Sequence, residues 1–147
     1  MFFNEAEFLF ETNVPRGELI VSRTDLQGII TYVNDTFAQI SGYKANELIG
    51  KHHNIVRHPD MPKVVFKEMW SILEKGKTWE GIIKNLRKNR GFYWVKAIVS
   101  GVYKDGEIVE YKSLRYPIGN EEKVSKQKEY DILKKENNEK KRYIEYR

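Results

Sequence analysis

The stretch VNDTFAQISGYKANELIGKHHNIVRHPDMP, residues 33–62, decides the fold of this chain of 147 residues. Its apolar runs are short, and glycine interrupts them at Gly42 and Gly50. Glycine commonly ends a helix because it adopts a positive φ without steric cost. We therefore predict two short helices, over residues 35–40 and 45–49, rather than one long helix.

The stretch ends at Pro62, which opens the longest helix that we predict in the central part of the chain. Proline suits the first helical turn because its missing N–H would have no partner there. The residues that follow have the apolar spacing of an amphipathic helix, and Gly76 ends it. The apolar stripe consists of Val65, Phe66, Met69, Trp70, Ile72 and Leu73.

Five predicted strands flank these helices. Two precede them, at residues 19–22 and 29–33, and three follow, at residues 78–88, 92–104 and 107–118. All are rich in β-branched and aromatic residues, and Gly, Asn and Asp occupy the turns between them. This order predicts an α+β fold, in which a five-stranded antiparallel sheet carries short helices on one face.

The two ends of the chain differ from this central domain of residues 18–118. Residues 1–17 predict a cap helix with an apolar stripe formed by Phe2, Phe3, Phe8, Leu9 and Phe10. Residues 119–147 predict a charged helical tail, because more than half of its residues are charged. The tail has only a weak apolar seam, which consists of Tyr130, Leu133, Asn137 and Ile144. We therefore expect this helix to leave the domain.

The motifs of residues 33–62 resemble a known family. Asn34-Asp35-Thr36-Phe37 and Ser41-Gly42-Tyr43 resemble the start of a PAS sensor domain, and Arg57-His58-Pro59-Asp60-Met61-Pro62 resembles the flavin-binding aerotaxis-receptor group. The resemblance reaches about Arg115. It implies a PAS fold for residues 18–118 and a noncovalent FAD whose redox state follows the respiratory chain. The chain would then be a redox sensor in aerotaxis or energy taxis signal transduction, and not an enzyme.

One face of the strand at residues 78–88 suits a flavin. Alternate residues of a strand share a face; here the set is Trp79, Gly81, Ile83, Asn85 and Arg87. Gly81 leaves room for a flat group, and Trp79 offers a planar face. Asn85 needs hydrogen-bond partners in a buried setting, which a backbone bulge or the polar edge of a flavin ring would supply. The resemblance favours the ring. Tyr93 is in the matching inward set of the next strand, and its position at the strand start would put its hydroxyl near the polar part of the cofactor.

The Arg57–Pro62 motif suits the diphosphate and adenosine of FAD. Arg57 offers paired donors to phosphate. His58 can donate to phosphate or stack on adenine, and Asp60 can accept from a hydroxyl or hold Arg57 in place. Spacing alone equally allows a local salt bridge in a loop. The resemblance adds Trp70 and Asn34 as cofactor-binding residues, and Asn34 is also an expected helix cap.

Composition limits the alternatives. The absence of cysteine excludes disulfides, thiolate metal sites and the covalent cysteine–flavin adduct of LOV photoreceptors. A haem-binding PAS gas sensor is one alternative, because His52, His53 and His58 could ligate iron. A cofactor-free PAS dimerisation module is another. No serine–histidine–aspartate order, metal-ligand spacing or glycine-rich phosphate loop indicates an enzyme.

Charge and hydropathy bear on partners. The net charge is +5, but lysines alternate with acids, so we expect no nucleic-acid partner. No apolar run approaches the ~20 residues that cross a bilayer. We expect a cytoplasmic protein that a partner recruits to the inner membrane face. The resemblance implies a membrane-bound chemotaxis transducer with HAMP or signalling helices, a missing C-terminal part of the same protein, or a second copy in a homodimer. A candidate contact surface is the outer sheet face, unless the N-terminal cap covers it. That surface comprises Ile82, Trp94, Ile98 and Leu114.

Overall fold

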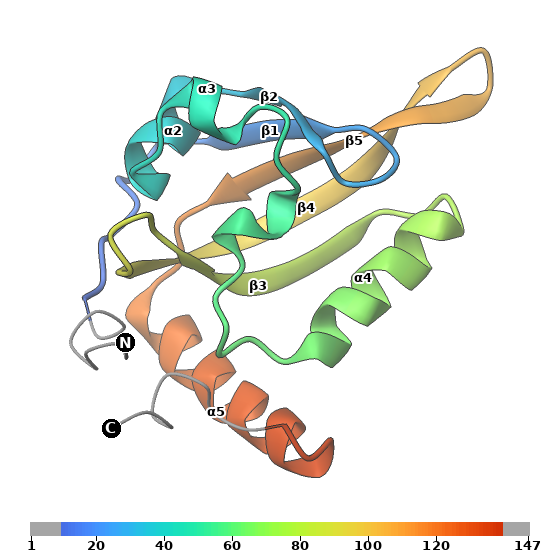
Figure 1. The fold of residues 1–147 in the computed structure, drawn as a ribbon. Coiled ribbons are helices and arrows are strands. Elements are labelled where there is room, and N and C mark those ends of the chain that lie inside the picture. Colours follow the sequence, from blue (N-terminus) through green and yellow to red (C-terminus); the bar gives the residue numbers. More distant parts are fainter. Residues whose placement is uncertain (1–9, 140–147) are drawn as a thin grey trace.

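The computed structural model describes residues 10–139, which Figure 1 draws in colour. In chain order the elements are β1 (Ile20–Thr24), β2 (Ile30–Val33), α2 (Asp35–Ser41), α3 (Ala45–Leu48), the 3₁₀-helix η1 (His53–Val56), α4 (Lys63–Glu74), β3 (Trp79–Leu86), β4 (Phe92–Lys104), β5 (Glu107–Tyr116) and α5 (Asn120–Glu136). The predicted α+β class is confirmed. Only η1 lacks a counterpart among the elements predicted for the described residues.

The five strands form one antiparallel sheet in the order β2-β1-β5-β4-β3. The first strand of the chain, β1, therefore pairs with the last, β5. Helices α2, α3, η1 and α4 lie over one face of the sheet, as predicted (Figure 1). This arrangement leaves β2 and β3 as edge strands, and it encloses the core between the sheet and the helices.

Local hydrogen bonds explain where the first elements begin and end. In the turn between β1 and β2, the Asp25 carboxylate accepts from the backbone N–H groups of Gln27 and Ile29, both at 2.9 Å. Asn34 caps α2, because its Oδ1 accepts from the N–H of Phe37 at 3.0 Å. The helix ends at Gly42, whose φ of 79° disfavours other residues. These turns bring the helical stretch back across the sheet.

The core combines the inner sheet face with the helices above it. Its fully buried residues are Ile20, Ile30, Phe37, Leu48, Val56, Leu73, Ile83, Tyr93, Val95 and Ala97. They come from every strand except β5 and from four of the helical segments. Full burial of a large apolar side chain contributes about 1.5–3 kcal/mol, so these residues hold the helices at fixed positions over the sheet.

The C-terminal helix does not leave the domain, so this prediction is wrong for residues 120–136. Tyr130 is buried, and its hydroxyl donates to the backbone carbonyl of Ile82 in β3. Lys134 is also buried and pairs with Asp60. The apolar pattern is weak because the buried positions of α5 are held by side chains with polar ends, which reach their partners while their apolar parts pack. In Figure 1, α5 lies beside β3.

The outer sheet face is partly covered. Ile82 and Trp94 are buried, whereas Ile98 and Leu114 are half-buried. Helix α5 contributes to this cover through its contact at Ile82. Residues 1–9 of the predicted N-terminal cap lie outside the described part, whereas residues 10–17 are described and form no helix; Glu11 bridges to Phe92 of β4 instead. The cap's one described aromatic, Phe10, is 73% exposed.

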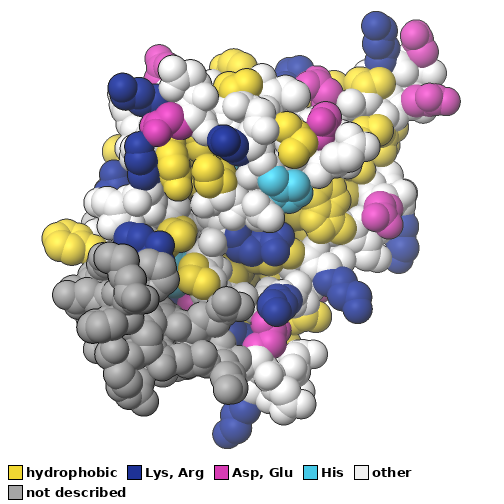
Figure 2. All heavy atoms as spheres, viewed as in Figure 1, with side chains coloured by type: hydrophobic (Ala, Val, Ile, Leu, Met, Phe, Trp, Pro, Cys, Tyr) yellow, Lys and Arg dark blue, Asp and Glu magenta, His cyan; other side chains and the backbone are white. Residues whose placement is uncertain are grey.

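Two further features bear on partners. Within residues 10–139, no helix combines the length and apolar character that a membrane span requires. Basic and acidic side chains alternate across the face that Figure 2 shows, without a broad patch of one sign.

Candidate functional site

A cavity of about 60 Å³ lies between the inner sheet face and the helices. One wall comes from β1, β3, β4 and β5, and the other from η1, Arg57 and α4. The apolar lining consists mainly of Val56, Phe66, Met69, Trp70, Leu73 and Val99, and the polar lining includes Ser22, His53, Arg57, Asn85, Ser113 and Arg115. An apolar pocket with a few converging polar groups is the usual form of a small-molecule site.

Asn85 and Arg115 form the polar centre of this cavity. Asn85 is buried; its Nδ2 donates to the Val56 carbonyl at 3.0 Å, and its Oδ1 accepts from Nη1 of Arg115 at 2.9 Å. Arg115 also donates from Nε to Oγ of Ser113 at 2.8 Å. Burial lowers the pKa of Arg115 to about 10. Both of these acceptors are neutral, so the positive charge of Arg115 is available to stabilise negative charge on a bound molecule.

His53 lies on the opposite side of the cavity. Its Nε2 is 3.0 Å from Oγ of Ser22, and its ring packs edge-on against Phe37. Burial, and then the charge of Arg115, hold the pKa of His53 well below its usual value. The imidazole is therefore neutral near pH 7. It can accept or donate a single hydrogen bond towards the cavity, depending on its tautomer.

Arg57 closes the cavity beside α4. Its guanidinium lies over the ring of Phe66, 4.0 Å from the ring centroid, and its buried Nε–H has no hydrogen-bond partner among the described residues. An unpaired buried donor costs about 1–3 kcal/mol. The backbone of Arg57 also bridges to Asn85 of β3. A donor without an acceptor on a cavity wall is the best indication that this cavity binds an acceptor group.

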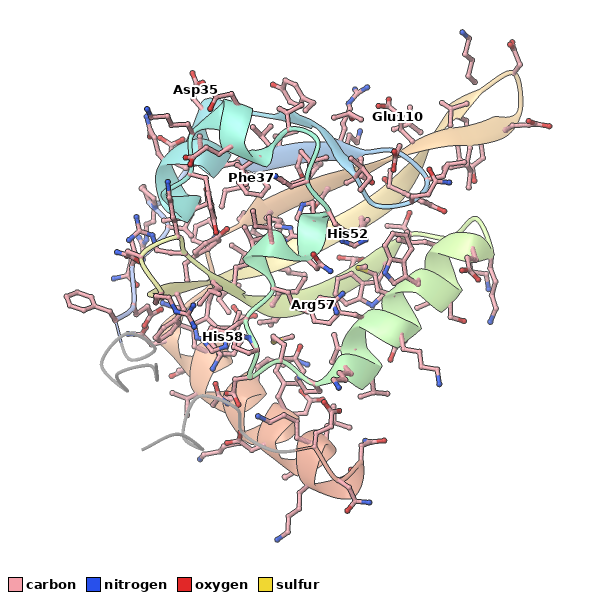
Figure 3. The ribbon with its side chains drawn as sticks, in the orientation of Figure 1. Asp35, Phe37, His52, Arg57, His58 and Glu110 are labelled. Atoms are coloured by element: carbon pink, nitrogen blue, oxygen red, sulfur yellow. The ribbon has the colours of Figure 1, made fainter. Side chains whose placement is uncertain are left out.

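His58 does not line the cavity. Its side chain is buried, and its Nδ1 accepts from the backbone N–H of Asp60 at 3.0 Å. Burial, and then the charge of Lys84, lower the pKa of His58 to about 3, so the ring is neutral. In Figure 3, the labels place Arg57 beside η1 and His58 further towards α5. His58 therefore shapes the turn at Pro59 in this structure.

Asp60 lies outside the cavity as well, and it does not hold Arg57. Its carboxylate pairs with Lys84 at 3.0 Å and with Lys134 of α5. Gln127 donates to the same carboxylate at 3.3 Å. Burial alone would raise the pKa of Asp60, but the two lysines outweigh it and lower the pKa. Asp60 thus forms ion pairs with residues distant in sequence, rather than the local salt bridge within the loop that spacing allowed.

Trp70 lines the cavity and packs edge-on against Tyr111, whereas Trp79 does not line it. The indole of Trp79 lies over Gly81, where any Cβ would fall inside van der Waals contact with the ring. The flat group that Gly81 admits is therefore this chain's own tryptophan.

Tyr93 and Asn34 also lie outside the cavity lining. Tyr93 is fully buried opposite Asn85 in the β3–β4 pair, and burial raises its pKa. Asn34 Oδ1 accepts from the N–H groups of Val21 and Phe37, and its Nδ2 donates to the Leu19 carbonyl. The side-chain amide of Asn34 thus forms hydrogen bonds with backbone groups.

Sequence reasoning considered His53 only as a possible iron ligand, and it missed Ser22, Ser113 and Arg115 as lining residues. Strand alternation could have found the last two. With Leu114 assigned to the outer face, Ser113 and Arg115 must point inwards. Within residues 10–139, no three His, Asp or Glu side chains gather as a metal site.

Comparison with known proteins agrees with this geometry. A family model described as the PAS fold matches residues 30–115. The aerotaxis receptor of Escherichia coli K12 is 44% identical over 128 residues, which cover 86% of this chain and 25% of the receptor. The nitrogen fixation regulatory protein of Klebsiella pneumoniae is 28% identical over 111 residues, which cover 75% of this chain and 22% of that protein.

A solved light-oxygen-voltage domain, studied with a flavin analogue, superposes with a TM-score of 0.68 at 20% identity and covers 84% of this chain and 90% of its own. That likeness shows the fold. The chain spans about a quarter of the length of the two curated relatives. The family match runs from β2 to β5 and covers every element that encloses the cavity except β1. This chain belongs to the PAS family, and within it to the relatives of the bacterial aerotaxis receptor.

Proposed function

We propose that this domain is a redox sensor that binds FAD noncovalently and reports its redox state to a chemotaxis transducer. The observation that carries the proposal is the unpaired Nε–H of Arg57 on the wall of a cavity centred on Asn85 and Arg115. The 44% identity with an aerotaxis receptor supports the signalling role. The likeness to a light-oxygen-voltage domain studied with a flavin analogue supports the class of ligand.

The residues of the cavity fit a flavin. Val99 and Leu73 offer apolar surface for a planar ring, and Trp70 offers an aromatic one. Asn85 can exchange its present partners for the donors and acceptors of the ring edge. Arg57 suits a phosphate or another anionic oxygen, as an arginine gives paired, directed donors.

The size of the cavity sets one condition on binding. At about 60 Å³ it is smaller than the ~300–1,000 Å³ of typical ligand pockets, so side chains must move to admit a ring. Met69 is flexible, and the Arg57 side chain is held mainly by its stacking on Phe66, which makes these two the side chains that can yield.

A bound flavin would supply reversible electron uptake. The protein's own part is electrostatic. The buried charge of Arg115 favours any form of the ligand that carries negative charge, and neutral His53 offers a nearby site for a proton. These two residues make the polar environment of the cavity sensitive to charge on its ligand.

For the partner, we propose a membrane-bound chemotaxis transducer, the remaining part of a larger receptor, or a second copy of the chain, with the domain on the cytoplasmic side. The match to a quarter of the aerotaxis receptor is what supports a larger assembly.

An absorption spectrum of the purified protein tests the cofactor. We expect flavin bands in the blue that bleach on reduction, and FAD on chromatography after denaturation. Recovery of FMN or of no cofactor after FAD supplementation would refute the assignment. A haem is the second candidate because His53 is a neutral imidazole in the same cavity, and it would give a Soret band instead.

A further inference from the structure

A buried ion cluster joins α5 to the rest of the domain. Its centre is the carboxylate of Asp60, which is fully buried and contacts Lys84 of β3 and Lys134 of α5. Gln127 of α5 bridges the same groups, because it accepts from Lys84 at 2.7 Å and donates to Asp60 at 3.3 Å. Gln127 also donates to Asp131 at 3.0 Å, within the same helix.

The cluster lies at the free edge of the sheet. There the backbone N–H of Lys84 points to Met61 Sδ, and the carbonyl of Ile82 accepts from Tyr130. The Arg57–Met61 segment and α5 thus cover the edge of β3 together. An exposed strand edge presents unpaired backbone N–H and C=O groups, so both covering segments protect and stabilise the sheet. Asp60 is the ion-pairing residue through which they contact each other.

The same two backbone segments, β3 and the loop of residues 57–61, carry both cavity residues and cluster residues. In β3, Lys84 belongs to the cluster and its neighbour Asn85 to the cavity, on opposite faces of the strand. In the loop, Arg57 belongs to the cavity and Asp60 to the cluster, and the Arg57 backbone bridges to Asn85. Three peptide bonds separate Arg57 from Asp60, and the buried His58 holds the turn between them.

We propose that Asp60 is a positioning residue, which seats α5 on the edge of β3 through Lys134 and transmits movement of the Arg57 segment to that helix. Seating α5 is independent of any ligand, whereas transmission rests on the proposed flavin site. Arg57 is one of the side chains that must yield when the cavity admits a ring, and Asp60 lies three residues further along the loop. The state of the cavity would thus alter how firmly α5 is held.

Hydrogen exchange on the purified full chain tests the seating of α5. Lys134→Met keeps the length and apolar part of the side chain and removes its charge. Lys135→Met is the matched control, since Lys135 is the next residue of the helix and is exposed. We expect exchange over residues 127–136 to rise about tenfold in Lys134→Met and to stay within about twofold in Lys135→Met. Gln127→Ala should give a smaller rise and stays informative if Lys134→Met fails to fold. Unchanged protection in both Lys134→Met and Gln127→Ala, or an equal rise in the control, would overturn the seating role.

A double-variant cycle and FAD release complete the test. If Asp60 and Lys134 act as a pair, Asp60→Asn combined with Lys134→Met should loosen α5 little more than either change alone, and an additive effect would overturn the pairing. FAD should dissociate faster from Lys134→Met than from Lys135→Met. Equal dissociation rates would overturn transmission and leave the seating role in place. A wild-type chain that binds no FAD would refute the proposed function and with it transmission, while the exchange data on α5 would still decide the seating role.

Discussion

Replacing Arg57 by Ala separates ligand binding from stability. In this structure the Arg57 guanidinium contributes a cation–π contact with Phe66, which is worth about 0.5–1 kcal/mol. Its buried, unpaired Nε–H costs about 1–3 kcal/mol. Removal of the side chain loses the cation–π contact but also removes the unpaired donor, so the free energy of unfolding of the ligand-free protein should stay the same or rise by up to about 2.5 kcal/mol.

The effect on FAD should be much larger. A hydrogen bond to a charged group contributes about 1.5–3 kcal/mol, so its loss should weaken FAD binding by roughly 10- to 150-fold. FAD titration followed by flavin fluorescence measures the affinity, and urea unfolding of the ligand-free protein measures the stability.

Arg23→Ala is the matched control. Arg23 is a surface residue that pairs with Glu110 at 3.4 Å and does not line the cavity. Surface pairs of this kind are worth about 0–1 kcal/mol, so this variant should keep both stability and affinity. Wild-type affinity in Arg57→Ala would show that Arg57 does not contact the ligand. Equal losses in both variants would point to a general electrostatic effect.

Three further predictions concern other residues. Gly81→Ala should destabilise the domain by about 1–3 kcal/mol, because the new Cβ would overlap the indole of Trp79, and urea unfolding will measure it. The pKa of His58 is about 3 when folded and near 6.5 when unfolded, so the unfolded chain binds more protons and stability falls as the pH drops below 6.5. The loss of stability should reach about 2 kcal/mol at pH 5. It should be smaller in His58→Asn, which keeps an acceptor for the Asp60 N–H. If the free energy of unfolding of this variant falls with pH as steeply as that of the wild type, His58 is not the cause. Asn85→Ala removes the Asn85 donor to the Val56 carbonyl and the acceptor of Arg115 Nη1, so it should lower stability by about 2–4 kcal/mol. It should also shift the flavin reduction potential more than it weakens FAD retention, and an unchanged potential would argue against contact between Asn85 and the ring.

The sheet and the cavity face of β3 could be predicted because both depend on local rules. Strand alternation alone assigns Asn85 to the buried face of its strand, and Asn85 lines the cavity. The same rule, applied to β5, assigns Arg115 to the inner face. His53 could not be predicted as a lining residue in this way, because a 3₁₀-helix has no two-residue repeat and η1 is one turn long.

The role of Asp60 could not be predicted from the sequence, because its partners are set by the tertiary fold. Lys84 and Lys134 lie 24 and 74 residues away along the chain. Nothing in a lysine-rich helix distinguishes the one lysine that is buried from its exposed neighbours. Helix α5 even exposes the apolar residues Val124 and Ile132 while it buries Lys134, which reverses the usual amphipathic pattern.

The side chains of the Arg57–Pro62 motif thus contact two different parts of the structure, although the sequence suggests a single ligand-binding set. Arg57 faces the cavity, whereas Asp60 faces α5, and the buried turn at His58 separates them. If Asp60 contacted only the ligand, Lys134 would have no bearing on FAD. If Asp60 seats α5, then replacing Asp60 or Lys134 should have similar effects on FAD release, although Lys134 does not line the cavity. Part of the motif is therefore explained by the helix that Asp60 contacts, and comparing the Asp60 and Lys134 variants shows whether Asp60 acts through the ligand or through α5.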